Sequence, residues 1–182
     1  MGSILEALSP EQQIACSTQN NILLTACPGS GKTRTLTHRL AYQVLRDPAS
    51  KKIKIAITYT NRAAEEITNR LEGMNIDQSS IWAGTIHQFC MHFIIRPYAM
   101  YSKRLCKGYR IIDDYSKKAY GREIAERLGM HLNYYDDPFQ YENVRTEYKR
   151  VLKEKKEIDF DAILLISEEL LASCAFIGSN IA

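Results

Sequence analysis

The chain has 182 residues, of which 45% are hydrophobic and 25% charged, and its formal net charge is +3. This composition excludes a disordered or fibrous chain, and the length is sufficient to bury a core. The weak excess of basic residues permits a polyanionic partner without arguing for one. No apolar stretch approaches a membrane span, the start Met1-Gly2-Ser3 has no signal-peptide pattern, and the five cysteines show no paired spacing, so we expect a cytoplasmic protein with free thiols and no membrane partner.

The first predicted elements surround a glycine-containing loop. The segment Leu8 to Ala15 reads as a short helix start, and the apolar run Ile22 to Thr25 as a buried strand. Residues 26–33 follow as Ala-Cys-Pro-Gly-Ser-Gly-Lys-Thr, and Lys32 to Arg46 has the spacing of an amphipathic helix that Asp47-Pro48 ends. A strand, a glycine loop and a helix in this order are the context in which such a loop binds phosphate.

Each residue type in the loop suits phosphate chemistry. Gly29 and Gly31 allow positive φ, so that successive N–H groups at the helix start can surround an anion. Lys32 adds a charge for the β- and γ-phosphates, and the Thr33 hydroxyl can ligate magnesium. Ala26 stands where a glycine is usual, and Pro28 gives up one N–H. We expect phosphate binding by Pro28, Gly29, Ser30, Gly31, Lys32 and Thr33.

The elements then alternate between strand and helix up to Pro97. Lys54 to Tyr59 predicts a strand that is apolar on both faces, and Asn61 can cap a helix that ends at Gly73. A third strand at Ile81 to Thr85 leads into a helix from His87 to Ile95, ended by Arg96-Pro97. This order predicts an α/β fold with a parallel sheet and crossover helices.

The second half reads as mainly helical, without a convincing strand pair. Helices are expected from Lys117 to Leu128, after Asp137-Pro138 and after Asp159. The middle one carries an apolar stripe at helical spacing, made by Tyr141, Val144, Tyr148, Val151 and Leu152.

Nine of the eleven tyrosines also lie in this half, interleaved with basic side chains. These are Lys103, Arg104, Lys107, Arg110, Lys117, Lys118, Lys149, Arg150 and Lys153. The tyrosines and lysines either form a stacking and phosphate-contacting surface for nucleic acid, or fill and solvate a small helical core.

Four short segments together resemble the superfamily 1 helicases of the UvrD, Rep and PcrA type. They are the segment around Gln12, the loop at 26–33, the segment Ile57 to Ile67 and the segment Ala83 to Cys90. They are similar to the adenine-reading Q motif, motif I and motifs Ia and Ib of that family, in the same order. Tyr109 to Asp113 and Asp159 to Leu164 look like weaker landmarks of its helical insertion.

The resemblance implies a RecA-like P-loop parallel sheet, incomplete within this chain, with a mainly α-helical insertion subdomain. Residues 1–96 would be the N-terminal part of the first motor domain and residues 97–182 the insertion, with the last helix returning toward the motor domain. The implied activity is that of an ATP-driven motor moving 3′ to 5′ on single-stranded DNA, with ATP and Mg²⁺ as cofactors.

The same resemblance assigns the site residues. Gln12 would read adenine, and Arg34 would lie near the base. Lys32 and Thr33 would be the catalytic residues, which hold the phosphates and Mg²⁺. Tyr59 would stack on a DNA base, with Thr60, Asn61, Thr85 and His87 near the strand. From the residues alone, Gln12 also reads as an exposed helical glutamine, and Tyr59 as the end of a strand with ordinary β-propensity.

The family also needs an acidic motif II and a second motor domain. No Asp-Glu pair follows an apolar strand in this sequence. We therefore expect these residues to be an N-terminal portion that works with C-terminal motor domains or a partner chain, and to be inactive alone. The alternative is a standalone nucleotide-binding interaction module without hydrolysis.

Overall fold

The computed structural model describes residues 2–181, with the side chains from Ile4 onward. The chain divides into two compact units, Met1–Ile86 and His87–Ala182, which are described in turn. Within the described residues, no helix combines the length and the apolar character needed to cross a membrane.

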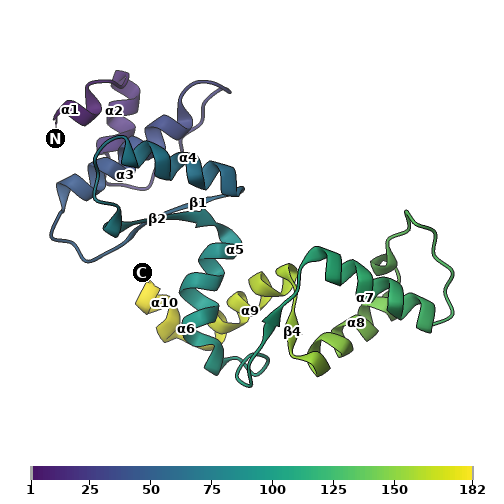
Figure 1. Ribbon diagram of the computed structural model, residues 1–182. Coiled ribbons are helices and arrows are strands. Elements are labelled where there is room, and N and C mark those ends of the chain that lie inside the picture. The colour runs from purple at the N-terminus through teal and green to yellow at the C-terminus, as the bar shows by residue number, and fades with distance from the viewer. Residues whose placement is uncertain (1, 182) are drawn as a thin grey trace. The chain divides into compact units, whose positions relative to one another are not determined.

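The first unit consists of two parallel strands covered by helices. Its elements are α1 (Gly2–Leu5), α2 (Pro10–Ser17), α3 (Lys32–Arg46), β1 (Lys54–Thr58), α4 (Asn61–Glu72), the 3₁₀ turn η1 (Gln78–Ser80) and β2 (Ile81–Thr85). The parallel register runs from Lys54 opposite Ile81 to Thr58 opposite Thr85. Helices α3 and α4 lie on the same side of the two strands (Figure 1). The core between them contains Leu40, Ala41, Val44, Ala56, Ile67, Leu71 and Ile76.

The strand predicted at Ile22 to Thr25 is wrong for this structure. Residues 21–27 have no regular secondary structure, and Leu23 is 90% exposed. An apolar run becomes a strand only when neighbouring strands satisfy its backbone N–H and C=O groups, and β1 pairs with β2 alone. The parallel sheet expected from the sequence is therefore confirmed only for its second and third strands.

The helices of this unit follow the sequence prediction closely. Helix α3 has the predicted bounds, although Leu36, at the helical spacing of the buried Leu40 and Val44, is exposed. Helix α4 begins at Asn61, but its cap is Thr60, whose hydroxyl accepts a hydrogen bond from Ala63 N at 3.2 Å. The expected cap at Asn61 is wrong by one residue, because Thr60 has the extended backbone that a capping side chain requires.

The second unit is mainly helical. It contains α5 (Ile86–Phe89), the π turn η2 (Cys90–Ile95), α6 (Arg96–Tyr98), the 3₁₀ turn η3 (Ala99–Tyr101), β3 (Arg110–Ile111), α7 (Asp114–Arg127), the 3₁₀ turn η4 (Pro138–Gln140), α8 (Glu142–Lys155), β4 (Glu157–Ile158), α9 (Phe160–Ser173) and α10 (Ala175–Ile181). The predicted helix end at Arg96-Pro97 is wrong. Pro97 lies at the start of the short helix α6, where its missing N–H is tolerated.

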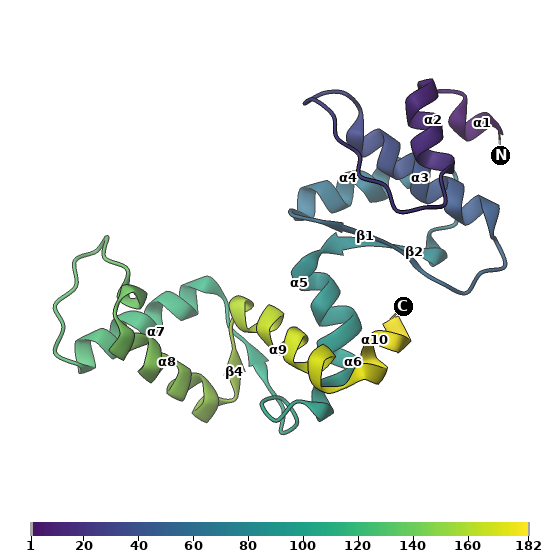
Figure 2. The ribbon, with the colours of Figure 1, turned by 180° about the vertical axis from the view of Figure 1, so that it is seen from behind.

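Two hydrophobic clusters stabilise this unit. One joins η2 to α9 and α10 and includes Ile95, Ile166 and Ile177. The other joins α7 to α8, which lie side by side (Figure 2), and includes Val144, Tyr148 and Leu152 of the predicted stripe. Of that stripe, Tyr141 is exposed.

The strand pair between the two clusters corrects the prediction that this half has none. Arg110 lies opposite Glu157 and Ile111 opposite Ile158 in a parallel arrangement. Strands of two residues are too short to produce a period in the sequence, so the pattern could not indicate them. Glu157 is buried at this point and accepts hydrogen bonds from the Arg110 guanidinium and, at 3.0 Å, from the Tyr120 hydroxyl.

Candidate nucleotide-binding site

The loop before α3 has the backbone of an anion cradle. Gly29 has φ 79° and Gly31 has φ 87°, both in the left-handed region that favours glycine. Gly31 is the N-cap of α3, and no side chain caps this helix. The 15-residue helix therefore presents its positive end at the loop.

Several N–H groups of the loop have no acceptor. Within residues 2–181, the backbone N–H groups of Gly29, Gly31, Lys32 and Thr33 donate to no protein atom. Only Ser30 N is engaged, with Cys27 O at 3.3 Å. Unsatisfied N–H groups at a helix start are the donors that phosphate oxygens accept from.

The Lys32 side chain folds back over this loop. Its Nζ donates to Ala26 O at 2.8 Å and to Cys27 O at 2.7 Å. An ammonium has three donors, so one remains for a phosphate oxygen. The lysine is exposed, which leaves its charge accessible from solvent.

Gln12 lies against the loop. Its Nε2 donates to Ser30 O at 3.2 Å, and its Oε1 accepts from Ser9 N at 3.1 Å. Together with the Gln12 N–H and the Ser9 hydroxyl this forms a capping box at the start of α2. Each amide atom keeps one hydrogen-bonding position, an N–H and a lone pair, which is the pair that adenine N7 and N6 would need.

Two contacts hold α2 against α3 and thereby place Gln12, and a third ties down the segment that follows α2. The Cys16 thiol donates to Thr35 O at 3.3 Å, and the Arg39 guanidinium donates to Ala15 O and, at 3.3 Å, to Asn20 O. Burial raises the pKa of the Cys16 thiol, so this cysteine is a neutral packing residue. Arg34, expected near the base, donates to Ala7 O at 2.8 Å ahead of α2.

Thr33 offers the loop's candidate ligand for a metal ion. Its hydroxyl makes no hydrogen bond within the part of the chain that the structure describes, while its carbonyl accepts from the Thr37 hydroxyl at 2.8 Å. No group of three or more His, Cys, Asp or Glu side chains that could hold a metal occurs in residues 2–181. A single hydroxyl beside a phosphate cradle fits Mg²⁺, which keeps several waters and binds through substrate phosphates.

The second group of predicted residues gathers at the carboxyl edge of β1 and β2. Tyr59 is 96% exposed, directly after β1, and Thr60 and Asn61 follow it at the start of α4. Thr85 ends β2 opposite Thr58, whose hydroxyl bonds to Thr60 O at 2.9 Å. An exposed aromatic ring with hydroxyl and amide groups beside it can contact a base and its phosphate.

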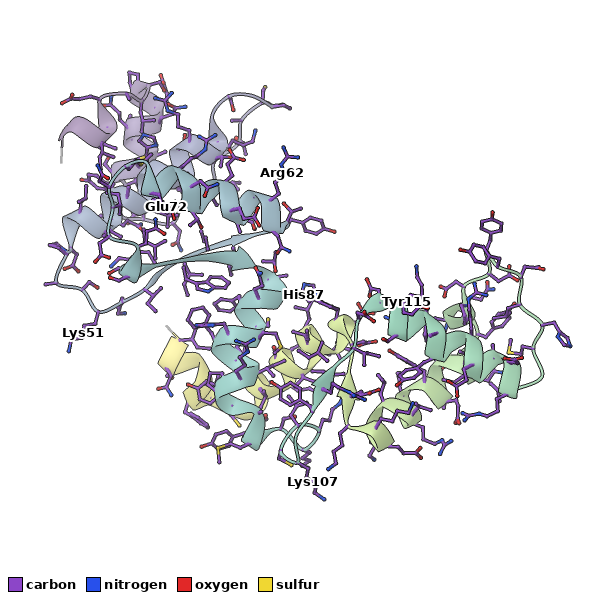
Figure 3. The ribbon with its side chains drawn as sticks, in the orientation of Figure 1. Lys51, Arg62, Glu72, His87, Lys107 and Tyr115 are labelled. Carbon is purple, nitrogen blue, oxygen red and sulfur yellow. The ribbon has the colours of Figure 1, made fainter. Side chains whose placement is uncertain are left out.

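His87, labelled in Figure 3, lies in α5 and is the first residue of the second unit. Its ring packs edge-on against Phe160, with 5.7 Å between the ring centroids. Four of the five residues predicted to contact DNA therefore lie together on the first unit, and the fifth, His87, lies on the second.

Sequence reasoning missed the capping box that ties Gln12 to the loop. The signal was present, because Ser9 and Gln12 have the spacing of a Ser-x-x-Gln box. It also missed Cys16 and Arg39, which have no motif of their own.

A glycine loop that opens a long helix beside parallel strands defines the class of P-loop nucleotide-binding proteins. The family described as UvrD/REP helicase N-terminal domain matches residues 8–137, well over half of the chain. The chain therefore belongs to this family, which implies a RecA-like fold.

Three relatives share the name ATP-dependent DNA helicase PcrA. That of Staphylococcus aureus (strain Mu50 / ATCC 700699) is 39% identical over 98 residues, covering 53% of this chain and 13% of the relative. The Bacillus subtilis (strain 168) protein is 40% identical over 95 residues, covering 51% and 13%. The Leuconostoc citreum protein is 27% identical over 187 residues, covering 86% and 25%. This chain thus spans a quarter or less of these relatives.

Proposed function

We propose that these residues bind ATP and single-stranded DNA as the N-terminal portion of an ATP-dependent 3′–5′ DNA helicase. The observation that carries the proposal is the set of four unsatisfied N–H groups at the start of α3, with Lys32 folded over them. A phosphate is the ligand that such an arrangement favours. The family and its helicase relatives support the choice of a nucleoside triphosphate.

In this proposal each residue has a separate task. The loop N–H groups and Lys32 hold the β- and γ-phosphates, and Thr33 ligates Mg²⁺, which neutralises charge on those phosphates. Gln12 reads the adenine edge through the two positions that its capping box leaves open. Arg34 lies near the base, and Gly31 lets the loop pass close to Gln12.

Single-stranded DNA would cross the carboxyl edge of the strands. Tyr59 supplies a stacking surface that every base can use, and Thr60, Asn61 and Thr85 supply polar groups for the backbone. The proposal adds His87, which follows Thr85 by two residues along the chain. Missing motor domains, on the same chain or on a partner, would complete the DNA track and the ATP site.

The test is binding of a fluorescent ATP analogue with Mg²⁺. Replacing Lys32 by Ala removes the one side-chain charge at the phosphates, and a contact of this kind contributes about 1.5 to 3 kcal/mol, or roughly ten- to a hundredfold in affinity. Lys51→Ala, in an exposed loop at the opposite end of β1 from Tyr59, removes the same charge and should bind like the unchanged protein. Unchanged binding by a folded Lys32→Ala variant would show that the loop is not the site.

A further inference from the structure

A groove of about 1290 Å³ opens in the second unit. It is lined by the loop 103–107 that precedes β3, the start of α7, η4, one face of α8 and the start of α9. Figure 3 labels Lys107 at the end of that loop. Cavities that hold small molecules measure about 300 to 1,000 Å³. The groove is therefore large enough for a segment of a macromolecule.

The face of α8 that lines the groove combines basic and apolar side chains. Its members follow one another at the spacing of a single helix face and are Arg145, Tyr148, Lys149, Leu152 and Lys153. Tyr148 and Leu152 are buried in the cluster between α7 and α8, whereas Lys149 and Lys153 are exposed. The helix thus presents two ammonium groups, one turn apart, next to an apolar strip.

The exposed lysines of the groove have no carboxylate partners. Among the described residues, no ion pair involves the six exposed lysines of the lining, which are Lys103, Lys107, Lys118, Lys149, Lys153 and Lys156. By contrast Arg150, on another face of α8, pairs with Glu147 and Glu154 at 2.5 Å each. The charge toward the groove is therefore free to attract an anionic partner.

Most carboxylates of the lining are already engaged with cations. Glu157 pairs with Arg110. Lys117 reaches Asp159 at 3.4 Å and Asp161 at 2.5 Å. Nine lysine and arginine side chains line the groove against five carboxylates in all. The groove is complementary in charge to an acidic partner.

The groove also has an apolar lining. Phe139 and Leu165 both contribute to it, and Leu165, in the second turn of α9, is 55% exposed. A chain of phosphates offers charge without an apolar surface, whereas an amphipathic helix offers a charged face beside an apolar stripe. The combination of unpaired lysines with an exposed leucine therefore favours an acidic helix over a plain polyanion.

We propose that this groove docks an acidic amphipathic helix of a partner protein, with its carboxylates toward the lysines and its apolar stripe toward Leu165. Carboxylates four residues apart on a helix lie about 6 Å apart along its axis, which is also the spacing of Lys149 and Lys153 on α8. A helix about 10 Å across has a cross-section of about 80 Å², so the groove has room for about three turns. Docking of this kind does not depend on nucleotide binding by the loop.

The probe is a fluorescein-labelled synthetic peptide of about 18 residues, long enough to form a helix, with glutamates and leucines on adjacent helix faces. Its binding to the 182-residue chain is measured by fluorescence anisotropy. The double variant Lys149→Gln with Lys153→Gln should lower the affinity about five- to tenfold at low salt and less at high salt. Leu165→Ala should lower it about three- to tenfold at every salt concentration, because apolar contacts are not screened.

Two control variants change matched positions outside the groove. Lys51→Gln with Arg62→Gln removes the same charge from two exposed side chains, both labelled in Figure 3. Leu171→Ala shortens an exposed leucine of α9 that does not line the groove. Both controls should bind the peptide like the unchanged protein. Losses in the controls equal to those in the groove variants would overturn the proposal.

A second peptide has the same composition in scrambled order, so that its glutamates and leucines share no helix face. It should bind about tenfold more weakly, because it can satisfy the lysines or Leu165 but not both. Equal affinity of the two peptides would mean that charge alone attracts them, and would overturn the proposal. Failure of both peptides to bind the unchanged chain would overturn it as well.

Two other occupants of the groove would give results that contradict the proposal. If nucleic acid fills the groove, an unlabelled oligonucleotide displaces the peptide and itself loses affinity in the variant of Lys149 and Lys153. If a second copy of this chain fills the groove, sedimentation shows a dimer that Leu165→Ala dissociates. Circular dichroism melts check that each variant is folded, which we expect because every substituted side chain is exposed.

Discussion

Replacing Gly31 by Ala should damage the loop through two separate effects. The backbone at Gly31 has φ 87°, and an L-residue in the left-handed region costs about 1 to 2 kcal/mol. The added Cβ would also lie 3.0 Å from Gln12 Nε2, so that side chain must give by a few tenths of an ångström, which weakens its bond to Ser30 O. A hydrogen bond of this kind contributes about 1 kcal/mol. We expect a total loss of between about 1 and about 3 kcal/mol, depending on how much of this hydrogen bond survives.

Gly29→Ala provides the matched control. Its φ is 79°, but a Cβ there would meet nothing within 4 Å, so only the backbone strain applies. Urea unfolding of the first unit can be followed by the fluorescence of Trp82, the single tryptophan, which lies in β2. Gly31→Ala should be less stable than Gly29→Ala, and replacing Gln12 by Ala as well should remove most of the difference. Equal stability of the two glycine variants would refute the contact between Gln12 and the loop.

Three further outcomes follow from the structure. Tyr59→Ala should lower single-strand affinity by about 1 to 3 kcal/mol and Tyr59→Phe far less; equal losses in a fluorescence titration would point to the hydroxyl instead of stacking. Asp113 is the N-cap of α7, and hydrogen bonds from the Ser116 side chain and N–H hold the pKa of its carboxyl below the usual range. The stability that the ionised carboxylate contributes is therefore present above the pKa of Asp113 in the unfolded chain. It is lost as the pH falls through the pKa of Asp113 in the folded protein. The Tm of the unchanged protein should therefore drop relative to Asp113→Asn below about pH 4, and a constant difference in circular dichroism melts would contradict this. The 182-residue chain should bind ATP without turning it over, since loop residues 26–33 include no carboxylate to place the attacking water; phosphate release that DNA stimulates and Lys32→Ala abolishes would show that a base is supplied within the chain or an oligomer of it.

The sequence predicted those elements whose ends are marked by residues next to them in the chain. Helix α3 has the predicted bounds because Gly31 and Asp47-Pro48 mark its two ends. The prediction of a strand at Ile22 to Thr25 was wrong because a strand depends on partner strands far away in sequence. The apolar run carries no information about those partners.

The candidate site shows the same division between local and distant contacts. The loop residues were predicted because their chemistry is local, and the structure adds the carbonyl contacts of Lys32. The groove in the second unit, lined by the loop 103–107, α7, α8 and α9, was visible in the sequence only as scattered lysines and arginines. The fold decides which of these gather, since Lys149 and Lys153 line the groove while Arg150 is engaged with glutamates on another face of α8.

The central claim is that the unsatisfied N–H groups at the start of α3 bind phosphate. The most direct measurement is the change in backbone amide resonances of the ¹⁵N-labelled 182-residue chain when ATP and Mg²⁺ are added. The largest shifts should belong to Gly29, Gly31, Lys32 and Thr33, with smaller changes at the Gln12 side-chain amide. A saturating shift confined to other amides, or no shift at the loop, would contradict the account.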